Sequence, residues 1–250
     1  NRPLRDRELL RGRYAALEAL RSTASVALAE ALQEIGDLER ILARIALGSA
    51  RPRDLAQLRN ACALLPALKT RLAALEAPLL RSLSGQLGDH ADTHALLARA
   101  LIENPPMLIR DGGVIAAGYD ASLDELRDIS EQADRYLTDL ESRERARTGL
   151  PSLKVGYNRV HGYYIELSRG QAGKAPDDYQ RRQTLKGAER YITPELKEFE
   201  GKVLSARDRS LAREKELYAG LLGTLMAVLP ALRSMAAAVA ESDVLVTLAA

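Results

Sequence analysis

The 250-residue sequence contains one cysteine, no tryptophan and only three histidines. A single cysteine excludes an internal disulfide, and such residues usually fill small core positions, which we expect for Cys62. No apolar run approaches the roughly 20 residues that cross a bilayer, so we expect no membrane partner. A charged and apolar leader is also lacking, and the first residue is Asn1. We therefore expect either a processed chain or a cut piece of a longer cytoplasmic protein.

Signatures of catalysis are scarce. The sequence has no P-loop and no GxGxxG motif. His90 and His94 are four residues apart and could hold a metal on one helix face, but without a nearby cysteine or third histidine a solvated polar face is the simpler interpretation. His161 has only Glu166 close in sequence and no nucleophile, which disfavours a catalytic role. We therefore expect no catalytic residue, metal site or cofactor site here.

Leucine and alanine make up much of the apolar fraction, and 28% of the residues are charged, a composition typical of long solvated helices. Through residues 4–101 apolar side chains recur three and four positions apart, which predicts stacked helices of about ten to fifteen residues. Glycine and proline predict the breaks between them. These fall at Gly36, residues 48–52, Pro66, Pro78 and residues 85–89.

Residues 102–120 have a different pattern. Pro105 and Pro106 do not fit inside a helix, and short apolar runs flank the Asp-Gly-Gly at residues 111–113. This arrangement predicts a two-stranded hairpin with a tight turn. A Gly-Gly pair can also belong to a phosphate loop, but no Lys-Ser/Thr follows it, so we assign no ligand to this turn.

Two long helices are predicted on either side of an irregular stretch. The first begins at Ser122, which has capping-box spacing to Glu125, and continues to about Gly149. The second begins at Pro194, with Thr193 as its cap. Helices that leave and return around an insert should pair antiparallel.

The stretch between them, residues 151–194, alternates apolar and polar side chains and predicts a small sheet of three or four strands. It holds five of the nine tyrosines, which we expect to form mainly the core of the sheet. The predicted fold is mainly α: a helical core with two long antiparallel helices and a small β-rich domain at their tip. We expect the core and first long helix in residues 1–145, the β-rich insertion in 146–194, and the returning helix and remaining core in 195–250.

Positive charge is concentrated in this insert. Residues 154–190 contain eight Lys/Arg and four Asp/Glu, whereas the whole chain has a net charge of only +2. Arg181, Arg182, Lys186 and Arg190 provide cations at short intervals, which suits phosphate oxygens rather than bases, since no recognition helix or zinc finger is present. The alternative is that these arginines pair with acids of the same insert and bind nothing.

Several runs of the sequence are characteristic. They are LKVGYNRVHGYYIELSRGQ, RRQTLKGAERYITPELKEFE, DLERILARIAL, the RPRDL segment and NPPMLIRDGGVIAAGYD. Together they resemble the MutS family of DNA mismatch repair proteins, in the part that joins its lever helices to its DNA-gripping clamp. The resemblance implies an all-helical core and lever with a β-rich clamp between the two long helices. It also implies that two subunits close their clamps over the backbone of duplex DNA.

Carried over residue by residue, the resemblance implies DNA contacts in the insert. With Arg190 from the charge pattern, the candidate DNA-binding residues are Asn158, Arg159, Arg182, Gln183, Lys186, Gly187 and Arg190. Many relatives have Asn at the position of Gly187, so the glycine offers only its backbone there.

The family's mismatch reader and its ATPase domain, which binds ATP and Mg²⁺, lie outside the resembling part. The resemblance therefore implies a non-enzymatic fragment of a bacterial, cytoplasmic, nucleoid-associated protein. Its implied partners are double-stranded DNA, a second MutS subunit and a repair protein such as MutL. The alternative is a helical scaffold for dimerisation or for repair-partner contacts, with little DNA binding of its own.

Overall fold

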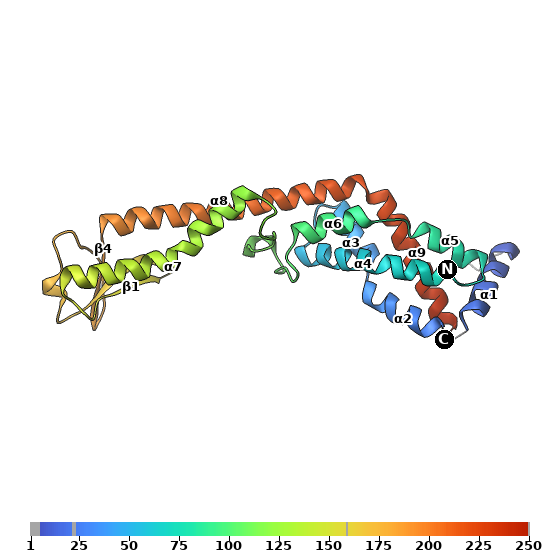
Figure 1. The fold of residues 1–250 in the computed structure, drawn as a ribbon, viewed down its shortest axis with the longest axis horizontal. Coiled ribbons are helices and arrows are strands. Elements are labelled where there is room, and N and C mark those ends of the chain that lie inside the picture. The colour runs from blue at the N-terminus through green and yellow to red at the C-terminus, as the bar shows by residue number, and fades with distance from the viewer. Residues whose placement is uncertain (1–5, 22–23, 159, 250) are drawn as a thin grey trace. The chain divides into compact units, whose positions relative to one another are not determined.

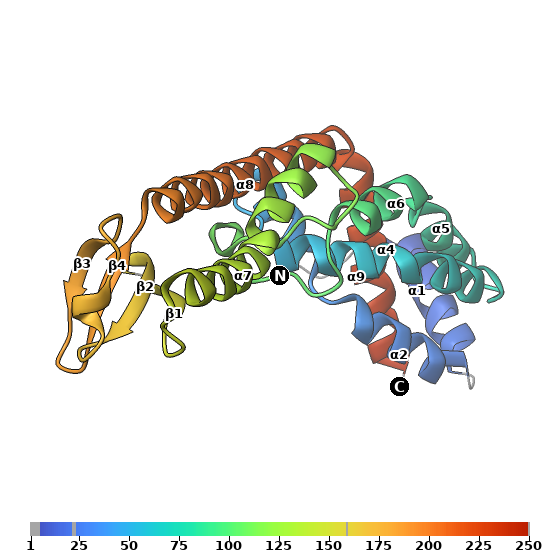
Figure 2. The ribbon, with the colours of Figure 1, turned by 60° about the vertical axis from the view of Figure 1, so that its left-hand side comes forward.

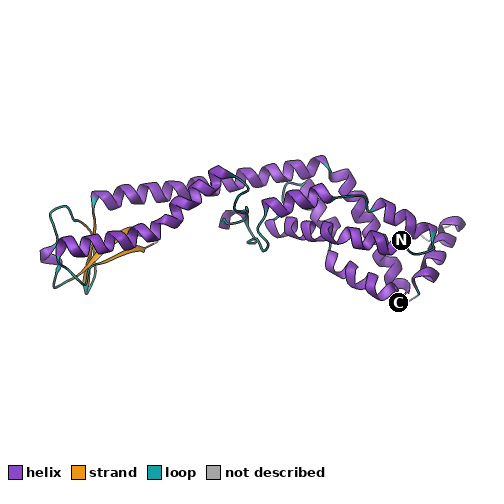
Figure 3. Cartoon of the chain, in the orientation of Figure 1, coloured by secondary structure: helices purple, strands orange, loops and turns teal. Residues whose placement is uncertain are grey.

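The computed structural model describes residues 6–21, 24–158 and 160–249. Its α-helices are α1 (Arg7–Leu20), α2 (Ala24–Ile35), α3 (Leu38–Ala46), α4 (Pro52–Ala73), α5 (Pro78–Gln86), α6 (Ala91–Ala100), α7 (Ala121–Thr148), α8 (Pro194–Ala227) and α9 (Leu229–Ala249) (Figure 1). Two short 3-10 helices are η1 (Ile109–Asp111) and η2 (Ala172–Lys174), and the strands are β1 (Lys154–Asn158), β2 (Gly162–Ser168), β3 (Gln180–Thr184) and β4 (Ala188–Ile192). Helix predominates, and the strands lie between α7 and α8 in the chain (Figure 3), which confirms the predicted fold class.

The chain divides into two compact units. The helical unit comprises Asn1–Tyr119 and Glu214–Ala250, and the sheet unit comprises Asp120–Arg213. Helix α8 contributes to both, because the boundary falls inside it. The predicted boundaries after residues 145 and 194 delimit only the β-rich insertion and not these two units. They stay a prediction.

In the helical unit, α4 packs against α2, α5 and α6, while α9 packs against α1, α2, α3 and α5. The predicted break at Pro66 is wrong, because α4 continues through this proline to Ala73. Leu65, Leu68 and Leu72 are buried on one face of α4, and this packing outweighs the cost of a proline inside a helix. Cys62 is buried on the same helix, as predicted, and burial raises the pKa of its thiol to about 11.

The predicted hairpin at residues 102–120 is also wrong. Only an isolated antiparallel bridge joins Leu101 to Ile115 in this segment, and η1 occupies part of the expected first strand. The backbone N–H groups of Gly113, Val114 and Ile115 instead donate to the buried carboxylate of Glu214, at 2.8, 3.1 and 3.2 Å. A side chain of α8 therefore satisfies donors that a strand ladder would have used.

No single helix among the described residues has the length and hydropathy of a membrane span. The pair α8 and α9 passes such a test when the two are taken together, but the helices are bent by 71° where they meet.

In the sheet unit, the ends of the two long helices follow local chemistry. Helix α7 begins one residue earlier than predicted, because Asp120, and not Ser122, is the cap: its Oδ1 accepts from the Leu123 N–H at 2.9 Å. The helix ends at Gly149, whose φ of 68° lies in the left-handed region that glycine tolerates best. Thr193 caps α8 as predicted, since its hydroxyl accepts from the Leu196 N–H at 3.1 Å.

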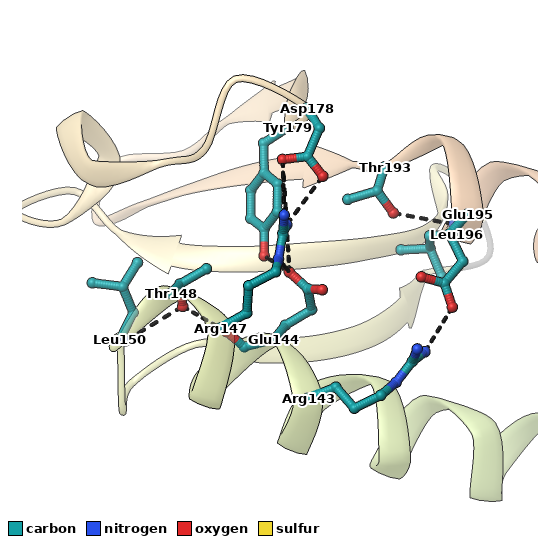
Figure 4. Close-up of polar contacts among 10 residues, drawn as sticks. All are labelled: Arg143, Glu144, Arg147, Thr148, Leu150, Asp178, Tyr179, Thr193, Glu195 and Leu196. Atoms are coloured by element: carbon teal, nitrogen blue, oxygen red, sulfur yellow. Dashed lines mark hydrogen bonds and ion pairs between the residues drawn. The ribbon is translucent and has the colours of Figure 1, made fainter.

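Helices α7 and α8 run antiparallel within this unit, as predicted. The Tyr136 ring of α7 stacks on the Phe199 ring of α8 with centroids 3.8 Å apart. Glu195 near the start of α8 accepts from Tyr136 at 2.7 Å. It also accepts from Arg143 at 2.6 Å (Figure 4). The pairing buries apolar side chains from both helices in the core of the sheet unit.

The sheet has the strand order β1-β2-β4-β3, and each neighbouring pair is antiparallel (Figure 2). On β2, Tyr163, Ile165 and Leu167 are buried and alternate with half-buried residues, so one face packs on the helices. Tyr179 and Tyr191 are buried in the same core, which confirms the structural role predicted for most of these tyrosines. Tyr157 differs, with 42% of its surface exposed.

Candidate nucleic-acid interface

The turn between β3 and β4 carries two of the predicted site residues, Lys186 and Gly187. The Leu185 N–H donates to the Ala188 carbonyl at 2.8 Å and closes a two-residue turn, in which Lys186 and Gly187 are exposed. In the described part of the chain, the Lys186 ammonium forms no ion pair. Its charge is therefore available to an external anion.

Arg169 lies beside this turn. Its N–H donates to the Gly187 carbonyl at 3.1 Å, and its guanidinium donates to the Lys186 carbonyl at 3.5 Å. Arg169 is exposed and, within the residues described, contacts no carboxylate. Arg169 and Lys186 together form what we call the turn cations: two uncompensated positive charges at one end of the sheet.

The charge pattern of residues 154–190 includes Arg169 as one of eight Lys/Arg but does not single it out as a candidate contact. The missing signal is the pairing of β2 with β4, in which Ser168 lies opposite Ala188 and the next residue therefore lies beside Gly187. Residue spacing along the chain does not reveal a pairing between strands twenty residues apart.

Arg190 lies on the central strand β4, and Gln183 is its partner on the edge strand β3. The Arg190 guanidinium donates to Glu166 at 2.8 Å and to the Gln183 side-chain oxygen at 3.1 Å, and it lies 3.9 Å from the centroid of the Tyr164 ring. Its side chain is only 16% exposed. The charge of Arg190 is thus largely compensated, whereas the Gln183 amide nitrogen keeps its donors because the oxygen faces Arg190.

Arg182 occupies an irregularity in β3, where the register with β4 shifts between Arg181 and Gln183. It donates to the two carboxylate oxygens of Glu200 on α8 at 2.9 and 3.0 Å, and to the Tyr163 carbonyl at 3.0 Å. Its neighbour Arg181 pairs with Glu189 at 2.9 Å.

Three arginines of the insert, Arg181, Arg182 and Arg190, pair with acids, as the alternative interpretation predicted. For Arg182 the acid lies on α8 rather than inside the insert. These pairs lower the net positive charge that the sheet presents. Near β4, the turn cations are the arginine and the lysine that no carboxylate compensates among the described residues.

Asn158 is the last residue of β1 and pairs with Gly162 at the start of β2, so it lies at the end of β2 opposite the turn cations. Its side-chain oxygen accepts from the Val160 N–H at 2.8 Å and from the His161 N–H at 3.2 Å, which fixes the β1–β2 turn. The predicted contact Arg159 lies outside the described residues. Gly162 pairs with Asn158 and Ser168 pairs with Ala188, so about 20 Å of strand separates the two ends at roughly 3.3 Å per residue. The structure does not bring Asn158 together with Lys186.

A polar network around the buried Glu144 and Tyr179 fixes the loop after η2 to α7 (Figure 4). The Tyr179 hydroxyl donates to Glu144 at 2.7 Å, and Arg147 donates to both Glu144 and Asp178. Burial, followed by the hydrogen bond to Glu144, raises the pKa of Tyr179 above its usual range. The network holds the sheet on a rigid helix, as a binding surface requires.

Metal-binding geometry is not found in the described part of the chain, where no group of three or more His, Cys, Asp or Glu side chains is arranged to hold an ion. His90 and His94 line a hollow beside Cys62 and Lys69 in the helical unit. Burial lowers the pKa of His90, which favours its neutral form.

Residues 118–209 match the family model described as MutS family domain IV. The matched range contains the sheet, the helix α7 and the first part of α8. The match supports the interpretation of the chain as a fragment of a MutS-family protein with a DNA-binding clamp.

Proposed function

We propose that the chain is a fragment of a MutS-family DNA mismatch repair protein, and that its sheet unit holds duplex DNA through the phosphate backbone. The observation that carries this proposal is the pair of turn cations, Arg169 and Lys186, exposed beside Gly187 within the range that matches MutS domain IV. Exposed cations without carboxylate partners attract phosphate irrespective of the base sequence.

We assign further phosphate contacts to three of the predicted residues, Gln183, Arg182 and Asn158. The Gln183 amide group suits a phosphate oxygen, because Arg190 occupies only its carbonyl oxygen. Arg182 can contribute only after it leaves Glu200. We assign Asn158 a second contact point on the same duplex, since about 20 Å corresponds to roughly six base pairs.

In the intact protein, α7 and α8 act as lever helices that carry a nucleotide-dependent change to the clamp, residues 146–194. A second subunit supplies the opposing clamp, and a MutL-type protein is the expected repair partner. Nucleotide and Mg²⁺ bind outside these 250 residues, and the protein works in the cytoplasm on the bacterial nucleoid. The match to MutS family domain IV supports the DNA-binding and dimerisation parts of this proposal.

The experiment is fluorescence anisotropy of the 250-residue chain with labelled homoduplexes of two unrelated sequences over a salt series. We expect equal affinities for both sequences and a logarithmic affinity that falls linearly with the logarithm of salt concentration. Affinity that is independent of salt, or no binding at the lowest salt, would contradict the proposal. A strong preference for one sequence would indicate base reading instead.

A second candidate function is a scaffold for protein contacts. A groove of about 510 Å³ lies between α1 and α9, lined mainly by apolar side chains that include the exposed Tyr14 and Leu248. Sedimentation equilibrium distinguishes the two functions. Self-association that Leu248→Ser abolishes, without DNA binding by the parent chain, would favour the scaffold.

A further inference from the structure

The ion pair between Arg182 and Glu200 joins a predicted DNA contact to α8. Both carboxylate oxygens accept from the guanidinium, in the bidentate geometry that arginine also uses for phosphate. The side chain of Glu200 is 14% exposed and that of Arg182 28%, so the pair is partly shielded from water. A phosphate at Arg182 must therefore displace a ligand that is already in place.

Glu200 is positioned independently of Arg182. Its Oε2 accepts from the Tyr163 N–H at 2.8 Å, and its carboxylate lies against Gly162, where a Cβ would overlap it. Burial by itself raises the pKa of Glu200, but hydrogen bonds from Arg182 and Tyr163 outweigh this effect and hold the pKa below its usual value of 4.5. The carboxylate is ionised at neutral pH, and the Tyr163 N–H is a donor to it that does not depend on the guanidinium.

We propose that Glu200 is an intramolecular competitor of DNA phosphate for Arg182, a positioning residue that withholds this arginine from the interface in the DNA-free protein. The inference rests on the proposed function. Transfer of the guanidinium from Glu200 to phosphate breaks a contact between β3 and α8, so DNA binding at this position loosens the strand from the helix. The turn cations have no such competitor and contact phosphate first.

The test compares Glu200→Gln with Glu198→Gln in the 250-residue chain. Glu198 lies on the same helix, is exposed and pairs with Lys202 at 2.7 Å, so both variants remove one negative charge from α8. The glutamine at 200 keeps a carbonyl oxygen for the Tyr163 N–H. Circular dichroism and thermal unfolding establish that both variants are folded.

We expect Glu200→Gln to bind homoduplex DNA about threefold more tightly, as loss of a partly exposed ion pair allows, and to steepen the salt dependence by about one unit. Glu198→Gln should change both quantities less. Replacing Arg182 with Ala should then cost more affinity in the Glu200→Gln background than in the parent chain. A merely structural role for Glu200 predicts weaker binding, not tighter binding.

The inference is overturned if the parent chain binds DNA and Glu200→Gln binds no more tightly than Glu198→Gln. It is also overturned if Arg182→Ala has the same effect in both backgrounds. If neither the parent chain nor any variant binds DNA at the lowest salt, the proposed function itself is contradicted. Competition between Glu200 and phosphate then has no basis either.

Discussion

The Tyr179 hydroxyl donates a 2.7 Å hydrogen bond to the buried carboxylate of Glu144, and this bond joins the segment before β3 to helix α7. Arg147 donates to the same carboxylate at 2.8 Å and to Asp178 at 3.0 Å. The ring of Tyr179 also packs in the apolar core of the sheet unit. A hydroxyl, a guanidinium and two carboxylates therefore fix the position of the sheet on α7.

The variant Tyr179→Phe should lower the free energy of unfolding of the sheet unit by about 1 to 3 kcal/mol, because it removes one donor from a buried carboxylate without changing the apolar contacts. Urea unfolding followed by circular dichroism measures this loss. Tyr157→Phe is the matched control, since Tyr157 is 42% exposed and the change should have little effect. Equal losses in both variants would contradict a special role for the bond to Glu144.

Acidification should weaken the contact between α7 and α8. The hydrogen bonds from Arg143 and Tyr136 hold the pKa of Glu195 below its usual value of 4.5. Since folding favours the ionised form, the stability that Glu195 contributes is present above about pH 4.5 and is lost as the pH falls through the lower folded-state pKa.

Thermal unfolding measured at several values between about pH 5 and pH 3 should therefore show a smaller loss of stability for Glu195→Gln than for the parent chain. Glu125→Gln, at an exposed position of α7, provides the control and should follow the parent. Parallel curves for all three proteins would show that Glu195 does not contribute to the acid response.

Gly162→Ala should destabilise the sheet unit by about 1 kcal/mol or more, since two separate costs apply. The φ of 72° at Gly162 lies in the left-handed region, and a Cβ at this position would overlap the Glu200 carboxylate. Denaturant unfolding measures the effect. Gly170→Ala is the control, because open space surrounds that position and its φ is not positive. The account is contradicted if the two alanine variants unfold at the same denaturant concentration.

Gly187→Asn should tighten DNA binding without a loss of stability. An added Cβ meets nothing within 4 Å at this position, and the backbone does not require glycine there. The new amide group would stand beside the turn cations and offer a phosphate donor. Anisotropy titration with homoduplex DNA checks the gain, with Gly173→Asn as a control at another open position. If Gly187→Asn leaves the affinity unchanged, the DNA does not contact the β3–β4 turn.

Helix positions in the sheet unit were predictable because the local signals are strong. Thr193 and Pro194 begin α8, Gly149 ends α7, and the antiparallel pairing of the two follows from the insert between them. Pro66 misled the prediction because tertiary packing decides whether a helix tolerates a proline. The hairpin at residues 102–120 failed for a related reason, since a distant carboxylate, Glu214, takes its backbone donors.

The candidate site was harder to predict than the fold. Counting charges identifies a basic insert, but it does not show that Arg190 stacks on Tyr164 and pairs with Glu166. The strand order places β2 beside β4, and only this pairing brings Arg169 next to Lys186. Availability of a cation depends on its partners in space, which residue spacing does not determine.

The central claim is that the turn cations contact DNA phosphate. The most direct measurement is the salt dependence of homoduplex affinity for a variant that carries both Arg169→Ala and Lys186→Ala. Lys69→Ala with Arg81→Ala removes the same charge from exposed positions of the helical unit and serves as the control. The account predicts weaker binding to every sequence and a salt slope smaller by about two for the first variant only. Equal slopes for the two double variants would contradict it.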